Sequence, residues 1–88
     1  MIKPHMYYWV NDELGREWEI LLEGEYEEYP DGNNIVADLE IVRYRLNKVV
    51  MLDGSIPQEI VDFAEMLLDS SDTYTDIQRE YEMVYKRA

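Results

Sequence analysis

The sequence predicts an α+β fold in which an antiparallel sheet of three to four strands is followed by two C-terminal helices packed on one face. Three observations lead to this fold class. Segments with the period of a strand precede those with the period of a helix, and no strand–helix–strand alternation occurs. The chain has only 88 residues and no cysteine, so we expect one domain, 1–88, held together by apolar burial.

The first strand and its turn are predicted near the start of the chain. Met6–Val10 is aromatic and rich in residues that favour strands. Asn11, Asp12 and Gly15 follow, and these residue types favour turns. This order indicates a strand that enters a hairpin.

The second strand has the clearest pattern in the chain. Apolar and acidic side chains alternate over 17–29, and a period of two is typical of a strand with one buried face. Leu21 interrupts the acidic side, whereas Gly24 lies on the apolar side and predicts a bulge or the close approach of another backbone. The apolar side comprises Trp18, Ile20, Leu22 and Tyr26. The acidic side comprises Glu17, Glu19, Glu23, Glu25 and Glu27.

The third strand is predicted over 35–46, after the turn-forming segment 29–34. Its apolar phase shifts between Ile41 and Val42, and a single bulge at that point restores the pattern. The short apolar run 49–52 is consistent with a fourth strand or with a segment that covers the core. The side chains that this bulge directs outward are Asp38, Glu40, Arg43 and Arg45.

Two helices are predicted in the last third of the chain. Ser55, Pro57 and Gln58 form a helix-start signal, with the serine as N-cap and the glutamine closing a capping box. Residues 70–73 break this helix and cap a second one. The helical stripes are Ile60, Phe63, Ala64, Leu67 and Leu68, then Ile77, Tyr81, Val84 and Tyr85. The predicted common core is Trp18, Ile20, Leu22, Phe63, Leu67, Ile77 and Tyr81.

The charge of the chain excludes several classes of partner. Twenty acidic residues against eight Lys and Arg give a formal charge of −12. We therefore expect no direct binding of nucleic acid, which depends on a basic surface, and no attraction to anionic membranes. No apolar run approaches the roughly 18 residues of a membrane span, and Met1–His5 does not resemble a signal peptide. We expect a cytoplasmic protein.

The residues that enzymes commonly use for covalent catalysis are scarce. The chain has no cysteine and a single histidine, His5, close to the N-terminus where chains fray. Two helices on a small sheet also leave little room for a substrate cleft of about 300 Å³. We expect no catalytic residues and no cofactor.

The segment from Asp69 to Glu80 suggests one metal site, a calcium-binding loop. Asp69 and Glu80 stand at the first and twelfth positions of an EF-hand pattern. The sixth position is Tyr74, where that loop needs glycine, and Ser71 and Thr73 replace acids. Capping between two helices explains the same residues, so we expect no metal.

The distribution of acids exceeds what composition requires. The row on the second predicted strand repeats every 6.6–6.8 Å or so, about half the charge density of one DNA strand. With Asp38 and Glu40 beside it, the row forms a sheet face with phosphate-like spacing in two dimensions. The alternative is an ordinary solvated face that serves solubility. Among the tyrosines, Tyr7, Tyr29 and Tyr74 are not assigned to the core and are free to make contacts.

In its size, in its acidic strand 18–27 and in the strand 37–42 followed by the helix start 55–58, the chain resembles the small acidic accessory proteins of bacteriophages and prophages. That group includes DNA-mimic inhibitors and anti-CRISPR proteins. The resemblance implies a non-enzymatic inhibitor that docks on the Lys/Arg surface by which a host defence protein, such as a CRISPR effector, holds DNA or guide RNA. The expected contact residues are Glu17, Glu19, Glu23, Glu25, Glu27, Tyr29, Asp38 and Glu40.

Two points stay open at the level of sequence. The first predicted helix is also acidic and is a rival contact surface, and Arg43, Arg45 and Lys48 depart from a uniform mimic. The other function class is a small adaptor module that binds through tyrosines and apolar surface, with incidental acidity. The oligomeric state is not indicated.

Overall fold

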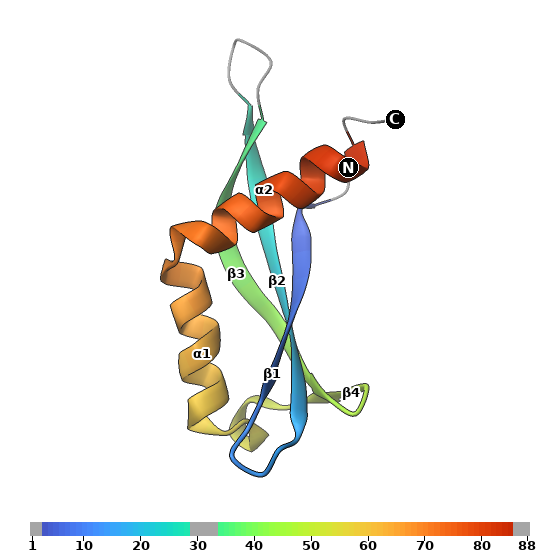
Figure 1. Cartoon of the computed structure of the whole chain (residues 1–88), viewed down its shortest axis with the longest axis vertical. Helices are drawn as coiled ribbons and strands as arrows, with labels where there is room; N and C mark the ends of the chain where they lie inside the picture. The colour runs from blue at the N-terminus through green and yellow to red at the C-terminus, as the bar shows by residue number, and fades with distance from the viewer. Residues whose placement is uncertain (1–2, 29–33, 86–88) are drawn as a thin grey trace.

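The computed structural model describes residues 3–28 and 34–85 and confirms the α+β architecture. Four strands form an antiparallel sheet in the order β1-β2-β3-β4, and two helices follow (Figure 1). The segment after the third strand, left open by the sequence, pairs as a fourth strand. The elements are β1 His5–Asn11, β2 Glu17–Glu28, β3 Asn34–Leu46, β4 Val49–Met51, a short 3₁₀ turn Asp53–Ser55, α1 Gln58–Asp69 and α2 Ser71–Tyr85.

One face of the sheet packs against the helices and forms the core. The side chains of Trp18, Ile20 and Leu22, all on the apolar side of β2, are at most 1% exposed. Phe63 packs against this core while partly buried, and the ring of Tyr81 lies 4.2 Å from that of Tyr26. The core cluster contains Trp18, Ile20, Leu22, Val36, Tyr44, Ile60, Ala64, Leu67 and Ile77.

The tyrosine at the start of α2 corrects one expectation. Tyr74 was expected to be free for contacts, but it is partly buried against the core cluster. Thr73 beside it is also buried, because the first turns of α2 lie close to the sheet. Tyr29, another tyrosine assigned to contacts, lies outside the described residues.

Two irregularities shape the pairing of β2 with β3. The register shifts between Leu21 and Leu22, opposite Val42, which confirms the predicted bulge. A second shift falls between Glu23 and Glu25, opposite Asp38, whose φ is +52°. The expectation of a single bulge was therefore wrong, because the sequence pattern around Asp38 shows no break in its apolar phase.

Gly24 sits at this second irregularity, as the sequence suggested. A Cβ atom added there would lie 2.7 Å from Cδ2 of Leu39 and 3.0 Å from the carbonyl oxygen of Ala37. Its N–H also donates to the carbonyl oxygen of Pro4 at 2.9 Å. This bond holds the residue that precedes β1 against the same position of β2. Glycine is required at this position because the neighbouring strand β3 approaches it closely.

The start of α1 differs from the predicted capping box. Pro57 occupies the N-cap position, no side chain caps the helix, and Ser55 ends the 3₁₀ turn with its N–H bonded to the carbonyl of Leu52 at 2.9 Å. The physical reason is the proline: a residue before proline avoids helical dihedrals, and Ile56 is extended at φ −96°, ψ 125°. Ser55 is thereby separated from the first helical turn.

The junction between the helices matches the capping prediction. Ser70 lies between α1 and α2, and its Oγ accepts a hydrogen bond from the N–H of Asp72 at 3.3 Å. The chain is helical from Ser71 onward, so the segment that suggested a calcium loop is mainly helix. A helical backbone does not present the ligand geometry of an EF-hand loop.

A side chain of α2 caps a backbone donor of β3. β4 pairs only with residues 44–46 of β3. The N–H of Val36, farther along β3, donates instead to Oε1 of Gln78 at 2.8 Å. Because buried backbone donors need a partner, this bond stabilises the packing of α2 on the sheet.

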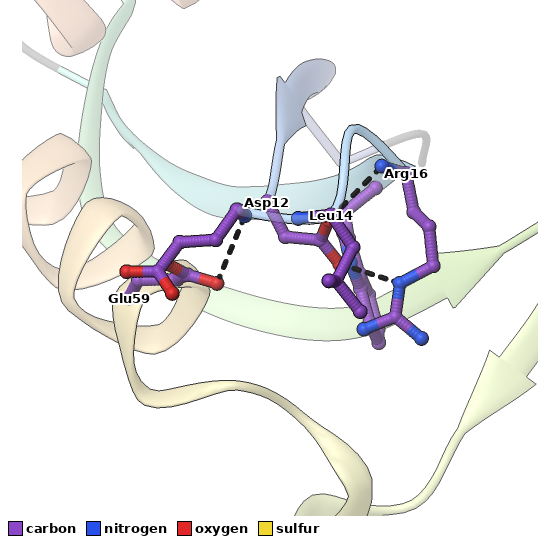
Figure 2. A network of polar contacts seen from close by, with 6 residues as sticks. Asp12, Leu14, Arg16 and Glu59 are labelled. Atoms are coloured by element: carbon purple, nitrogen blue, oxygen red, sulfur yellow. Dashed lines mark hydrogen bonds and ion pairs between the residues drawn. The ribbon is translucent and has the colours of Figure 1, made fainter.

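The β1–β2 turn is organised by a buried carboxylate, that of Asp12 (Figure 2). Its Oδ1 accepts the N–H groups of Leu14 and Arg16, each at 2.9 Å. Its Oδ2 accepts the Nε–H of Arg16 at 2.7 Å and the indole N–H of Trp18 at 3.0 Å. One side chain thus joins the turn to the largest residue of the core.

The same turn contacts α1. The backbone N–H of Glu13 donates to Oε1 of Glu59, in the first turn of the helix, at 3.3 Å (Figure 2). The residue types of the turn indicate only a turn-forming role for Asp12, because nothing in the sequence shows that the indole of Trp18, six residues later, returns to it.

The titration of Asp12 follows from this environment. Burial of the carboxyl raises its pKa, but the hydrogen bonds from Trp18, Arg16 and Leu14 favour the ionised form and lower the pKa to about 2. A group whose pKa is depressed in the folded state stabilises the fold above its unfolded pKa, near 3.9. That stabilisation is lost as the pH falls through about 2.

We predict that Asp12→Asn lowers the melting temperature by roughly 5–15 °C at neutral pH, because the amide cannot accept every one of these bonds. The difference from the wild type should shrink as the pH falls from about 4 to about 2, where Asp12 itself becomes protonated. Thermal unfolding followed by circular dichroism at several pH values measures both effects. Glu13→Gln makes the same charge change at a neighbouring exposed side chain and should have little effect. A pH-independent difference would contradict the assignment.

We predict that Gly24→Ala destabilises the protein by about 1–3 kcal/mol, since the added methyl would clash with Leu39 and the Ala37 carbonyl. Urea unfolding of the variant and of the wild type gives the difference in their free energies of unfolding. Gly54→Ala is the matched control, because a Cβ there meets nothing within 4 Å. Equal costs at the two glycines would show that backbone entropy, and not packing, determines the effect.

Candidate binding surface on the open sheet face

The sheet face opposite the helices, here called the open face, carries most of the predicted contact residues. The cross-strand register places them in rows. The rows read Trp9–Glu19–Arg45–Val50, then Tyr7–Leu21–Arg43, then His5–Glu23–Glu40. The rows therefore bring acids, bases and aromatic rings together across the strands, which the sequence of β2 alone does not show.

Two of the predicted glutamates are paired with bases. Oε2 of Glu19 lies 3.2 Å from Nη1 of Arg45, whose Nη2 donates to the carbonyl of Lys48 at 3.2 Å. Oε1 of Glu23 lies 3.5 Å from Nζ of Lys3. Both carboxylates are half-buried. Because each is paired with a base, the part of the predicted acidic row that lies between β1 and β3 is neutralised.

Leu21 is buried even though it faces away from the helices. Its side chain is 7% exposed, and its cross-strand neighbours are Tyr7 and Arg43. Nε of Arg43 is also covered and makes no hydrogen bond within the described part of the chain. Long arginine stems commonly cover apolar surface, so Leu21 forms a small apolar centre beneath its neighbours.

A second group of predicted residues lies farther along the β2–β3 hairpin and is exposed. Glu25, Asp38 and Glu40 have no ion-pair partner among the described residues, and Glu27 is exposed on the same strand as Glu25. We call these four residues the distal acidic cluster. Glu17 is exposed at the opposite end of β2, apart from them. The structure thus divides the predicted site in two.

The end of the open face near Trp9 carries an aromatic ladder, of which the sequence indicates only Tyr7 as free to make contacts. The rings of His5 and Tyr7 lie 6.1 Å apart edge to face, and those of Tyr7 and Trp9 lie 6.3 Å apart and stacked. Trp9 is 58% exposed. The alternation of side chains along a strand was the available signal, because it places alternate residues of 5–9 on one face.

A shallow hollow of about 380 Å³ adjoins this ladder, so the expectation that the fold leaves little room for a cleft of about 300 Å³ was wrong. Its lining combines an aromatic ring, two carboxylates and two bases, which suits binding through stacking and ion pairs. The residues that line it are Trp9, Glu17, Glu19, Arg45, Asn47 and Lys48.

Comparison of the chain with the families of known proteins, with curated proteins and with solved structures finds no match. Within residues 3–28 and 34–85, no helix is long and apolar enough to cross a membrane. In the same residues, no group of three or more His, Cys, Asp or Glu side chains is placed to hold a metal ion.

We predict that Leu21→Ala lowers the free energy of unfolding by about 2–3 kcal/mol, as expected for a buried leucine, although it lies on the open face. Val49→Ala, at a residue that is 60% exposed, should cost less than about 0.5 kcal/mol. Urea unfolding of both variants measures the contrast. A small cost for Leu21→Ala would mean that its cross-strand neighbours do not enclose it in solution.

Proposed function

We propose that this protein is a non-enzymatic inhibitor that docks the distal acidic cluster on the Lys/Arg-rich nucleic-acid-binding surface of a host defence protein, such as a CRISPR effector. The observation that carries the proposal is that Glu25, Asp38 and Glu40 are exposed and have no ion-pair partner in the described part of the chain, whereas Glu19 and Glu23 are held by bases. The unpaired carboxylates are those available to a partner.

The shape of the hairpin supports docking in a cleft. β1 pairs with β2 only as far as Glu23, and β4 pairs with β3 only as far as Tyr44. Beyond these points β2 and β3 continue as a two-stranded ribbon that extends past the rest of the sheet (Figure 1). A narrow acidic ribbon can enter a groove that is built to hold a nucleic acid strand.

Electrostatics favour the encounter with such a groove. The chain carries a formal charge of −12, so a basic surface attracts it at long range and accelerates association. Each ion pair formed with the distal acidic cluster would replace a contact between the partner and a phosphate. Because Arg45 and Lys3 are already engaged, they do not repel the partner as free cations would.

A second function class is supported by a separate observation. Trp9 is 58% exposed and stacked on Tyr7, and rigid aromatic side chains are enriched at the centres of protein interfaces. The alternative is therefore an adaptor module that binds a partner protein through the aromatic ladder, with acidity that serves solubility.

We predict that the triple variant Glu25→Lys/Asp38→Asn/Glu40→Lys loses inhibition of DNA binding by guide-loaded CRISPR effectors, measured over a panel of effectors by fluorescence anisotropy. Asparagine is chosen at position 38 because Asp38 has a positive φ, which asparagine tolerates. The inhibition by the wild type should weaken as salt rises, since it depends on exposed charges.

The matched control is Asp62→Lys/Glu65→Lys/Asp69→Asn, which makes the same net charge change on exposed residues of α1, the rival surface. The control should inhibit as well as the wild type. If α1 is the contact surface instead, the α1 variant loses inhibition and the Glu25/Asp38/Glu40 variant keeps it. Inhibition that survives in both variants, or that is indifferent to salt, contradicts acidic docking and favours the adaptor class.

A further inference from the structure

The outer edge of β1 is a sheet edge at which a further strand could pair. In the described residues β1 pairs with β2 alone, so it forms one edge of the sheet. Hydrogen bonds join residue 4 to residue 24 and residue 12 to residue 16, and such bonded pairs recur every two residues in an antiparallel ladder. The even-numbered residues of β1 therefore direct their backbone groups toward β2. Tyr7 and Trp9 direct theirs outward.

This edge lacks the features that commonly prevent pairing. Edge strands are protected by charged side chains, proline or a bulge, yet His5–Asn11 contains no Asp, Glu, Lys, Arg or Pro and pairs with β2 in an unbroken register. The absence of acids is notable in a chain with 20 of them, because neighbouring β2 is rich in glutamate. No acidic side chain of β1 itself would therefore repel a second copy at this edge.

A groove runs beside the same edge. It has a volume of about 350 Å³ and is lined by His5, Tyr7 and Trp9 from the open face and by Met6 from the core face. Ile77 and Tyr81 of α2 form its other wall. The C-terminal part of α2 crosses over β1 and extends past it (Figure 1). A strand added to β1 would lie beneath this overhang.

We propose that two copies of this chain pair antiparallel through β1, about a two-fold axis at Tyr8, so that one sheet runs through both copies. The sequence of β1 is suited to this pairing. With Tyr8 opposite its own copy, Tyr7 lies opposite Trp9, Met6 opposite Val10 and His5 opposite Asn11. The outward backbone groups then face one another as bonded pairs.

The pairing accounts for the exposed aromatic ladder. The stacked rings of Tyr7 and Trp9 in one copy would continue into those of the other, giving four aromatic side chains in contact on the open face. Such a two-fold interface is isologous and closes on itself, so it stops at a dimer. The distal acidic cluster lies on another part of the molecule, so this proposal does not depend on the proposed function.

Sedimentation equilibrium of the full chain from about 1 μM to about 1 mM tests the proposal. We expect a species of twice 10.6 kDa, whose association strengthens as salt screens the repulsion between two acidic chains. Tyr7→Lys/Trp9→Lys should shift the protein to monomer, because like charges would face each other across the axis. Tyr7→Lys/Trp9→Glu places opposite charges face to face and should remain dimeric.

The control variant Val42→Lys/Val49→Lys adds the same charge at exposed positions outside β1 and should also remain dimeric. Hydrogen exchange of the wild type provides a measurement that needs no variant. The amides of Tyr7 and Trp9 should exchange slowly in concentrated solution and rapidly on dilution. A wild type that stays monomeric, a dimer that survives both lysine substitutions in β1, or a dimer in which these two amides exchange freely would overturn the proposal.

Discussion

Two helices cover only one face of this four-stranded sheet, and the rest of the structure depends on that constraint. Because side chains alternate along a strand, burying Trp18, Ile20 and Leu22 forces the intervening residues of β2 onto the other face. The glutamates of β2 are tolerable only there, where water or a base can solvate them. The open face, its ion pairs and its aromatic ladder all follow from this division.

The turn between β1 and β2 is held in place by polar contacts with the core and with α1. The carboxylate of Asp12 binds the indole of Trp18 and two backbone N–H groups of its own turn. Through Glu13 the turn also contacts Glu59 at the start of α1. The position of the first hairpin relative to α1 is therefore held by polar contacts as well as by apolar packing, which keeps β1 and its free edge in a defined place.

The open face combines two kinds of surface with different physical behaviour. In the proposed function the distal acidic cluster acts through charge, so its interactions would extend over a Debye length and weaken with salt. The aromatic ladder and the edge of β1 act through short-range stacking and backbone hydrogen bonding, which screening affects little. Arg45 and Arg43 lie on β3, across β2 from the aromatic ladder, where Arg45 neutralises Glu19 and Arg43 covers Leu21. We therefore propose separate sites on this one sheet, one for a basic partner and one for a second strand.

Much of the fold and part of the site were predictable, because they depend on local periodicity. The alternation along β2, the bulge at Val42 and the helix junction at Ser70 were each visible as a pattern within a short segment. The capping box failed because the restriction that Pro57 imposes on Ile56 outweighed the capping preference of Ser55.

The sequence by itself determined which side chains of each strand share a face, since a period of two follows from backbone geometry. Only the tertiary structure decided which of them become neighbours across strands. The bulge at Asp38 changes the register beyond Glu23, and so it leaves Glu25 opposite Ala37 while Glu19 meets Arg45. Whether a glutamate is paired or available is therefore a property of strand register, which arises from contacts between residues distant in the chain.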